Sequence, residues 1–460
     1  MAAGAWAGSR RAPRYVAALS RVPSLGATFS GRLPTELGRR FAVNPPNRVS
    51  HRPVGPMKKI LILLTSSYPC GEGETFVANE MPYLASAFDE IIVLTNDTVS
   101  EQARPLPGSI TLVRHPYELG VMEKIRSLLG LLSPAVWQEI RRVRSGYRRS
   151  VDGRILATVL VSWRKAAKFA RIIRRLAARV PRAEVHVYSY WASDMAVAAA
   201  VARRKAWVHR AYCRAHRWDV YLDRGAFLPF RHLLATHLDH YLFVSEHGRR
   251  YFETLMGRSY PSVGYSRLGT PPVSPTPLAR VRPFTLVSCS GMIPRKRVEV
   301  IAEALSNVTS DVRWIHIGEG PSRGTVEAAC AELPAHVNAE LRGGLPNPEV
   351  LALYATVRPS LFLSVSRSEG LPVSMMEAMS AGIPVMGTDV DGVREIISHG
   401  ANGVLLSPDP TPHEVASAID AFASMPESEH AGYAQRAWAT WSADFNADRN
   451  YEAFLRITQA

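Results

Sequence analysis

Two glutamates stand eight residues apart in SRSEGLPVSMMEAMSAGIPV, residues 366–385, among side chains that are mostly small or apolar. A carboxylate in such surroundings is costly unless something binds it. Glu369 precedes a Gly-Leu-Pro turn, and Glu377 follows in VSMMEAMSAG, a segment with the start and stop signals of a helix. Because carboxylates accept hydrogen bonds from vicinal hydroxyls, such a pair suits a ligand that carries two sugar rings.

A phosphate site is predicted between the two carboxylates. The preceding LFLSVS is typical of a strand, so the helix start faces the carboxyl edge of a parallel sheet, where open α/β folds bind ligands. The backbone amides from Gly370 to Ser374 and the helix dipole suit a phosphate at that point. Two hydroxyl acceptors on either side of a diphosphate match the layout of a nucleotide sugar.

The elements that must position these groups follow an alternating pattern from Met57 onward. Short apolar runs typical of buried strands alternate with helical periodicity, which predicts an α/β protein with parallel sheets flanked by helices. The expected strands are Ile60–Leu64, Ile91–Leu94, Val185–Tyr188, His240–Val244, Phe284–Ser288, Arg313–Ile317, Leu361–Ser364 and Ile383–Gly387.

A chain of 460 residues is too long for one hydrophobic core, and a linker divides this one. Five prolines fall within the fifteen residues from Gly269 to Pro283, a composition typical of a stiff linker, which we place at residues 271–283. We therefore expect one domain over residues 57–270, a second over residues 284–440, and a closing C-terminal helix over residues 441–460.

The net charge of +15 is concentrated in two segments. Residues 1–56 hold nine arginines against one acid, and residues 121–182 hold sixteen lysines and arginines against three acids. These segments carry +8 and +13, so the rest of the chain carries −6. For residues 1–56 three interpretations stay open: a disordered extension or unused upstream start, an Arg-rich transit peptide, or an arm for nucleic acid.

The basic insert at residues 121–182 contains an amphipathic pattern, RKAAKFARIIRRLAARV. A core helix with a solvated basic back and a helix attached to an anionic membrane surface are both compatible with it. A nucleic-acid partner is not expected, because no basic motif is interleaved with aromatic residues. The apolar face is Phe169, Ile172, Ile173, Leu176 and Val180, and the basic face is Lys165, Lys168, Arg171, Arg175 and Arg179.

Location is indicated by two absences in the sequence. No run of about 18 uncharged apolar residues occurs, so a membrane-spanning helix is not expected. Four widely spaced cysteines show neither zinc-site nor disulfide spacing, which favours reduced thiols. We expect a cytoplasmic protein, peripheral at the inner face of the plasma membrane. The cysteines are Cys70, Cys213, Cys289 and Cys330.

The sequence resembles a known family. EGLPVSMME matches the E-x7-E motif of retaining GT-B glycosyltransferases of the group 1, or family four, type. From Met57 the similar motifs follow in order: YPCGEGETFVANEMPYL, VYSYWASDMA, YCRAHRWDVYLDRGAFLPFR and SRLGT, then SCSGMIPRKRVEVIAEAL, IGEGP, GTDVDGVREII and NGVLL. The resemblance is strongest to the bacterial branch that builds capsular, exopolysaccharide or lipid-linked glycans. It implies two Rossmann-like domains that face a central cleft, with the acceptor on the first and the nucleotide sugar on the second.

The resemblance also implies roles for individual residues. Catalytic roles fall to Glu369 on the donor-sugar hydroxyls, Lys296 on the leaving diphosphate, and His216 beside the donor sugar. Further donor-binding residues are Glu377 on the ribose, Arg297, Gly291, and the amides of Gly370, Leu371 and Val373. Cleft or acceptor candidates are Gly71, Gly73, Glu74 and Asp219, although Glu74, Asp219 and Tyr221 are equally suited to ordering their own loops.

Two departures from the family pattern concern phosphate and metal. Many relatives have arginine where Met292 follows Gly291, so Arg295 or Arg297 is expected to substitute for it. Asp389-Val390-Asp391 spells D-x-D, the metal–nucleotide signature of the other large glycosyltransferase fold. We interpret it as a coincidence and predict no metal and no cofactor.

The function that the resemblance implies is transfer of a hexose from a UDP-sugar or GDP-sugar to a glycan or lipid-linked acceptor, with retention and without a metal. The expected partners are the nucleotide sugar, the acceptor and an anionic membrane surface at residues 121–182, and no nucleic acid. Two alternatives stay open. A nucleotide-sugar epimerase would turn over donor without acceptor, and a non-catalytic membrane-associated protein of a polysaccharide assembly complex would release no nucleotide.

Overall fold

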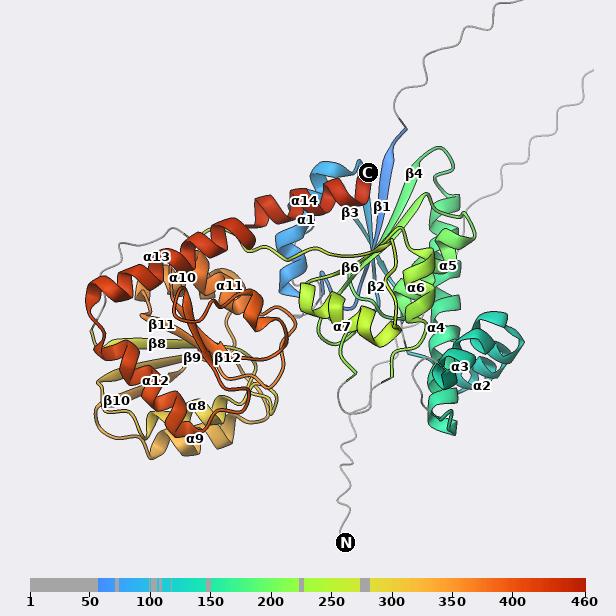
Figure 1. Cartoon of the computed structure of the whole chain (residues 1–460). Coiled ribbons are helices and arrows are strands. Elements are labelled where there is room, and N and C mark those ends of the chain that lie inside the picture. The colour runs from blue at the N-terminus through green and yellow to red at the C-terminus, as the bar shows by residue number, and fades with distance from the viewer. Residues whose placement is uncertain are drawn as a thin grey trace, which may run out of the picture. The chain divides into compact units, whose positions relative to one another are not determined.

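The computed structural model describes residues 57–70, 74–98, 100, 106, 110–116, 118–145, 150–222, 227–273 and 282–460. The extension predicted at residues 1–56, and the candidates Gly71 and Gly73, lie outside the described residues. The described chain forms two parallel sheets with helices packed against them (Figure 1). We call the parts built on these sheets the first and second domains.

The first domain is built on a seven-stranded parallel sheet with the order β3-β2-β1-β4-β5-β6-β7. The order reverses between β1 and β4, which are paired, and ligands bind at such a switch point in open α/β sheets. Its strands are β1 (Lys59–Thr65), β2 (Glu90–Thr95), β3 (Ile110–Arg114), β4 (Glu184–Ser189), β5 (Arg210–Ala215), β6 (His240–Phe243) and β7 (Val263–Tyr265).

The second domain repeats this topology in a six-stranded parallel sheet with the order β10-β9-β8-β11-β12-β13. Its switch point lies between β8 and β11, and the loops after these two strands carry Lys296 and Glu369. Its strands are β8 (Phe284–Cys289), β9 (Val312–Ile317), β10 (Val337–Leu341), β11 (Leu361–Ser364), β12 (Val385–Thr388) and β13 (Gly403–Leu406).

All eight strands expected from the sequence are confirmed, and β3, β5, β7, β10 and β13 are additional. Some helices begin with a side-chain cap: Asp152, for example, accepts the N–H of Ile155 at 2.7 Å. The helices are α1 (Thr75–Ala87), α2 (Val121–Arg126), η1 (Ser127–Leu132), α3 (Pro134–Ser145), α4 (Gly153–Ala178), α5 (Asp194–Arg204), α6 (Arg231–His237), α7 (Glu246–Met256), α8 (Val298–Leu305), α9 (Arg323–Ala331), α10 (Asn347–Val357), α11 (Val373–Ser380), η3 (Asp391–Glu395), α12 (Pro412–Ser424), α13 (Glu427–Asp444) and α14 (Ala447–Gln459).

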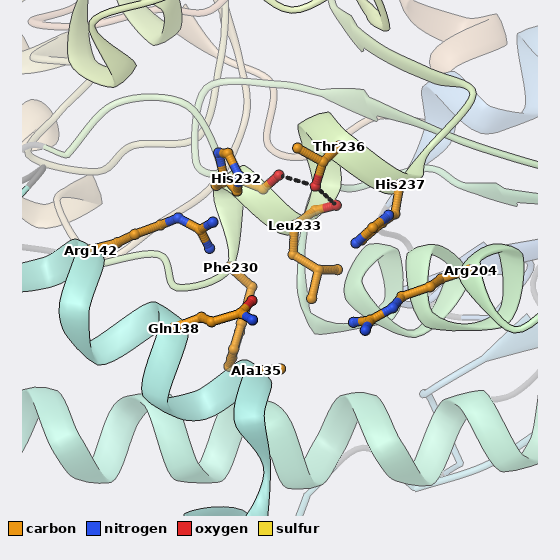
Figure 2. Close-up of a pocket in the computed structure, with 9 residues that line it drawn as sticks. All are labelled: Ala135, Gln138, Arg142, Arg204, Phe230, His232, Leu233, Thr236 and His237. Atoms are coloured by element: carbon orange, nitrogen blue, oxygen red, sulfur yellow. Dashed lines mark hydrogen bonds between the residues drawn. The ribbon is translucent and has the colours of Figure 1, made fainter.

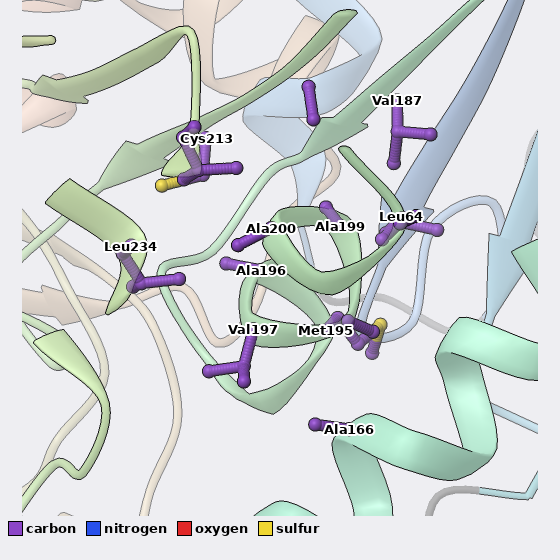
Figure 3. Packing of buried hydrophobic residues seen from close by; sticks show 14 of the residues in the cluster. Leu64, Ala166, Val187, Met195, Ala196, Val197, Ala199, Ala200, Cys213 and Leu234 are labelled. Atoms are coloured by element: carbon purple, nitrogen blue, oxygen red, sulfur yellow. The ribbon is translucent and has the colours of Figure 1, made fainter. Parts of the chain in front are cut away.

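Apolar side chains cover both faces of each sheet. On β1, Ile60, Ile62 and Leu64 belong to one cluster and Leu61 and Leu63 to the cluster on the other face. This is why the strand sequence is continuously apolar rather than alternating. On one face the alanine-rich α5 packs between the sheet and α4 (Figure 3). No helix in the described part of the chain is both long and apolar enough to cross a membrane.

The C-terminal helix α14 packs against α1 of the first domain. Beneath it, Arg214 on β5 and Glu80 on α1 form a fully buried ion pair, with 2.7 Å between Nη1 and Oε2. The Arg214 guanidinium also lies 4.2 Å from the ring centre of Phe454 on α14. Burial raises the pKa of Glu80, although the charge of Arg214 opposes this. Loss of either partner would leave the other as a buried charge without compensation, which is strongly destabilising. The pair therefore stabilises the packing of α1, β5 and α14.

Candidate active site

The N-terminus of α11 presents unpaired backbone amides. Pro372 is its cap residue and no side chain caps the helix. The N–H groups of Gly370, Leu371, Val373 and Ser374 donate to no acceptor among the residues that the structure describes. Free amides and the positive end of the helix dipole make this turn a site for an anion.

Two cations from the loop after β8 lie beside the α11 amides. Lys296 Nζ is 2.5 Å from Glu369 Oε1, and Arg295 Nη1 is 3.7 Å from Glu369 Oε2. Burial alone raises the pKa of Glu369, but the charge and hydrogen bond of Lys296 outweigh it, so the pKa is lowered and the carboxylate is ionised. We call the amides of Gly370, Leu371, Val373 and Ser374, with Arg295 and Lys296, the anion site.

Arg297 belongs to the support of this site. Its side chain is 1% exposed, its Nε donates to Val365 O at 2.6 Å, and its Nη2 donates to Pro408 O at 3.0 Å. It also pairs with Asp409. These contacts tie the guanidinium to the strand end behind the anion site, so Arg295 is the arginine beside Glu369.

Glu377 is the second carboxylate of the motif and is 6% exposed. Asn347, at the start of α10, donates to its Oε1 at 2.7 Å. Burial raises the pKa of Glu377 to about 7, and the Asn347 hydrogen bond offsets this in part. A buried carboxyl with one side-chain donor is suited to further hydroxyl donors from a ligand.

The D-x-D aspartates have partners within the protein. Asp391 Oδ2 accepts from Ser368 Oγ at 2.5 Å and from the N–H of Glu369 at 2.9 Å. Asp389 pairs with Arg394. Asp391 therefore fixes the backbone on which Glu369 stands. The next residue must be glycine, because a Cβ on Gly392 would come within 2.0 Å of Gly370 O.

His216 lies at the end of β5 among aromatic rings. Its Nε2 donates to the carbonyl of Tyr190 at 3.1 Å, and its ring centre is 4.6 Å from that of Trp191. Burial and the neighbouring Arg214 lower its pKa to about 3, so the imidazole is neutral at physiological pH. With Nε2 as the donor, Nδ1 is the nitrogen able to accept a hydrogen bond.

The first domain meets the anion site directly after His216. Arg217 Nε donates to Ser368 Oγ at 2.8 Å. A Cβ on Gly370 would lie 3.1 Å from Arg217 N, so only glycine leaves both backbones in place. Gly291, which was expected to bind the donor, is exposed after β8.

Glu74 and Asp219 order the loops on the first-domain side. Glu74 accepts the N–H groups of Ser67 and Tyr68, each at 2.6 Å, and a hydrogen bond from Trp191. Asp219 accepts the N–H groups of Ala192 and His216, each at 2.6 Å. Burial raises the pKa of Asp219 to about 6. The two carboxylates hold the turns that follow β1, β4 and β5.

Residues 276–437 match the family model described as glycosyl transferases group 1. The matched range includes the whole anion site, Glu369 and Glu377. This part of the chain is therefore similar to the group 1 glycosyltransferases. The resemblance noted in the sequence is thereby confirmed for the donor-side motifs.

Curated relatives match parts of the chain. A protein of Escherichia coli strain K12 named as a colanic acid biosynthesis glycosyltransferase, WcaL, is 28% identical over 201 residues, which are 42% of this chain and 49% of that protein. The N-acetyl-alpha-D-glucosaminyl L-malate synthase of Bacillus anthracis is 29% identical over 123 residues, 26% of this chain and 31% of that protein. This chain thus spans about half the length, or less, of these relatives.

Solved structures share the fold over most of the chain. The crystal structure of Anabaena Alr3699/HepE in complex with UDP has a TM-score of 0.59 and 17% identity, and covers 86% of this chain and 98% of that chain. The lipopolysaccharide outer core galactosyltransferase WaaB, in its apo form, has a TM-score of 0.59 and 17% identity, over 87% and 98%. The predicted GT-B fold with two Rossmann-like domains is confirmed.

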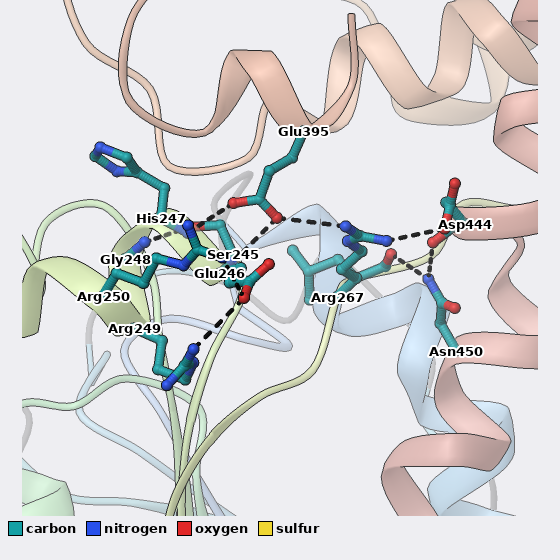
Figure 4. Close-up of polar contacts among 11 residues, drawn as sticks. Ser245, Glu246, His247, Gly248, Arg249, Arg250, Arg267, Glu395, Asp444 and Asn450 are labelled. Atoms are coloured by element: carbon teal, nitrogen blue, oxygen red, sulfur yellow. Dashed lines mark hydrogen bonds and ion pairs between the residues drawn. The ribbon is translucent and has the colours of Figure 1, made fainter. Parts of the chain in front are cut away.

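Glu395 of η3 joins the second domain to the first domain. Its carboxylate accepts the N–H groups of Glu246 and His247, at 3.0 and 2.7 Å, at the start of α7 (Figure 4). A carboxylate is favoured at a helix N-terminus. The Arg267 guanidinium lies 3.5 Å from the Glu395 carboxylate and 2.9 Å from the Asp444 carboxylate. These contacts join the two domains through the motif DGVREII.

Sequence reasoning missed three polar residues of the site. Asn347 begins α10 directly after the turn Gly-Gly-Leu-Pro. The turn can be recognised in the sequence, but its contact with Glu377 was not predicted. Arg217 stands next to the predicted His216. Asp391 was considered only as part of the D-x-D pattern, and its hydrogen bond from the N–H of Glu369 was not predicted.

Proposed function

We propose that this protein is a glycosyltransferase of cell-surface polysaccharide assembly, which moves a hexose from a nucleoside diphosphate sugar to a glycan or lipid-linked acceptor. The observation that carries the proposal is the anion site, where four unpaired amides and two cations converge beside an ionised carboxylate. The match of residues 276–437 to the group 1 family and the names of the curated relatives support the same class. A donor with a diphosphate is supported by the fold shared with a chain solved with UDP.

In this proposal the diphosphate lies on the anion site. Glu369 accepts hydrogen bonds from the donor-sugar hydroxyls, and Glu377, with Asn347 beside it, accepts them from the ribose. Neutral His216 takes part through hydrogen bonding near the sugar, since a pKa of about 3 is too low for a general base at pH 7.

We further propose retention at the anomeric carbon and no metal. The bond between C1 and the diphosphate oxygen breaks, the acceptor oxygen bonds to C1 on the same face, and its proton passes to the leaving diphosphate. Negative charge develops on that diphosphate, and Lys296, Arg295 and the α11 amides are placed to stabilise it. This arrangement supports departure of the diphosphate without a divalent cation.

The proposal is tested by a transfer reaction in excess EDTA. UDP-glucose, UDP-galactose, UDP-N-acetylglucosamine and GDP-mannose are first screened by thermal shift, because a ligand of the folded state raises its stability. With the donor so found and an acceptor, we expect transfer to continue in EDTA and the linkage to keep the donor's configuration. Loss of transfer that manganese restores would contradict the metal-free mechanism. Donor conversion without acceptor would favour an epimerase instead.

The raised pKa of Glu377 predicts a pH dependence of nucleotide affinity. Ribose hydroxyls donate to the ionised carboxylate, so binding favours the deprotonated form, which is a minor species below a pKa of about 7. We expect the affinity for the nucleoside diphosphate to fall about tenfold between pH 8 and pH 6 by calorimetry. Because the diphosphate itself titrates, Glu377→Gln is the control. An equal pH dependence in both proteins contradicts the assignment.

The same shift has a consequence for stability. The folded-state pKa of Glu377 is raised from 4.5 to about 7, so its stabilising contribution is complete below about pH 4.5 and is lost as pH rises through about 7. Glu377→Gln should therefore leave the protein at least as stable as the wild type at pH 8. This keeps a binding defect in the variant distinct from unfolding.

We place the acceptor on the first domain and the protein at the inner, anionic face of the plasma membrane. The support for this location is the charge of +13 on residues 121–182.

A further inference from the structure

Exposed large apolar side chains gather on one short segment of the first domain. Of the eleven such side chains in the described part of the chain, seven lie between residues 121 and 137. Leu132 is 82% exposed and Val121 is 75% exposed. A concentration of this kind marks an interaction site rather than an ordinary surface. The seven are Val121, Met122, Ile125, Leu128, Leu129, Leu132 and Trp137.

These side chains project from a folded support, which we call the hairpin: α2, η1 and α3, residues 121–145. η1 packs closely on α4, since a Cβ on Gly130 would lie 3.0 Å from Leu160. Arg164 on α4 pairs with Glu123 at 2.7 Å, and Trp137 Nε1 donates to Leu131 O at 2.6 Å. Because the inner face is anchored on α4, the apolar residues are held on the outer face.

The hairpin is also positively charged. Lys124 and Arg126 on α2, and Arg141 and Arg144 on α3, are exposed among the apolar residues. The acids of residues 121–182 are engaged: Glu123 pairs with two arginines, Glu139 is buried and Asp152 caps α4. The partner that fits is therefore both apolar and anionic. A second copy of this chain would bring the same positive charge and is disfavoured.

A cationic cavity of about 200 Å³ lies on the inner side of α3, where it meets α5 and α6 (Figure 2). Arg142 and Arg204 extend into it from α3 and α5, and neither forms an ion pair with any described residue. No acidic residue lines the cavity. Burial and Arg142 lower the pKa of His232 in its wall to about 4, so the arginines carry the charge. Guanidinium groups without a carboxylate partner suit a phosphate.

We propose that the hairpin docks the protein on an anionic phospholipid bilayer, with its seven apolar side chains in the acyl boundary and its exposed lysine and arginines at the lipid phosphates. The cavity, on the inner side of α3, is not part of this surface. The proposal deepens the location given under the proposed function by naming the residues and the lipid chemistry. Of the two interpretations left open for the basic helix, the structure favours the core helix, because Phe169, Ile173 and Leu176 of α4 are core residues. The exposed apolar surface lies on α2 and η1 instead, where an interfacial segment buries it.

The test is flotation of the full chain with vesicles, in the absence of nucleotide. Vesicles of phosphatidylcholine with phosphatidylglycerol are compared with vesicles of phosphatidylcholine alone. We expect binding to the first and at least about tenfold weaker binding to the second, because juxtamembrane basic residues are attracted to anionic lipid. Equal binding to both, or to neither, overturns the proposal.

Two variants separate the apolar and cationic parts. Leu129→Ser with Leu132→Ser should weaken binding at least about tenfold, since the apolar burial of two leucines, 60% and 82% exposed in the free protein, is lost. Lys124→Gln with Arg126→Gln should weaken binding to the anionic vesicles about tenfold and leave the phosphatidylcholine result unchanged. The matched controls are Trp438→Ser on α13, and Arg449→Gln with Arg456→Gln on α14, which should bind as wild type.

The proposal is overturned if either test variant binds as tightly as the wild type, or if the controls lose as much. Thermal unfolding verifies that each variant is folded. The thermal shift with the nucleotide sugar should be unchanged in the hairpin variants, because the anion site is in the other domain. A failure of vesicle binding is thus distinguishable from a failure of the proposed glycosyl transfer.

Discussion

Replacing Glu369 by glutamine is expected to lower the rate of glycosyl transfer about 100-fold or more, a loss of the size seen when one catalytic hydrogen-bonding group is removed. The carboxylate lies between Arg295 and Lys296, at 3.7 and 2.5 Å, and we propose that it also holds the donor sugar. Glutamine keeps the size of the side chain but loses its charge. Nucleoside diphosphate binding should survive, because Lys296 loses a competing carboxylate and the α11 amides are unchanged.

The control for this variant is Glu332→Gln, which changes an exposed glutamate at the end of α9. Transfer is measured with the donor found in the thermal-shift screen, and unfolding is followed to show that both variants are folded. Full activity of Glu369→Gln would remove Glu369 from the catalytic set. An equal loss in Glu332→Gln would show that the assay reports stability rather than chemistry.

Replacing Lys296 by glutamine is expected to lower the affinity for UDP or GDP about 10-fold to 100-fold, the value of a hydrogen bond between charged groups. The Lys296 side chain is 16% exposed and comes from a different strand from the α11 amides, so its charge is poorly replaced by water. Uridine or guanosine, which lacks the diphosphate, should bind both proteins equally. Lys205→Gln, at an exposed position after α5, is the matched control.

Two results for Lys296→Gln would contradict the proposed role of Lys296 in binding the diphosphate. If the variant also loses the nucleoside, the site has been disrupted as a whole. If it binds the diphosphate as the wild type does, Lys296 is only the partner of Glu369, and Arg295 carries the phosphate alone.

The strands with buried apolar runs could be predicted from the sequence. The five strands that were not predicted lack such a run, for different physical reasons. β5, Arg210–Ala215, contains two arginines, yet Arg214 is fully buried. Its partner Glu80 lies 134 residues earlier, so no local pattern announces that the charge is compensated. β3 and β10 are edge strands with exposed positions, and β7 has only three residues, so their apolar signal is short or diluted.

The part of the candidate site that lies within a single sequence motif could be predicted from the sequence. Glu369, Glu377 and the α11 amides stand within nine residues, from 369 to 377. Asn347 and Asp391 reach them from other loops, and only the packed sheet brings those loops together. The choice between Arg295 and Arg297 also depended on the fold. Arg297 has a positive φ of 51° and points to the loop after β11, which the sequence PRKRV does not reveal.

The exposed surface of the hairpin shows a different limit of sequence-based prediction. The sequence identified residues 121–182 as basic, but within that range only the amphipathic pattern of α4 was recognised. Which apolar residues stay exposed depends on what α4 already covers. Leu129 and Leu132 are exposed because η1 turns its other side to α4, a tertiary contact that periodicity alone does not encode.

The central claim is that the α11 turn and Lys296 hold a diphosphate while Glu369 holds the sugar attached to it. Calorimetric titration of the same nucleoside diphosphate into Lys296→Gln and Glu369→Gln tests this most directly. The account predicts opposite responses: affinity falls about 10-fold to 100-fold in Lys296→Gln and stays equal or rises in Glu369→Gln. Equal losses in the two variants, or no loss in Lys296→Gln, would contradict it.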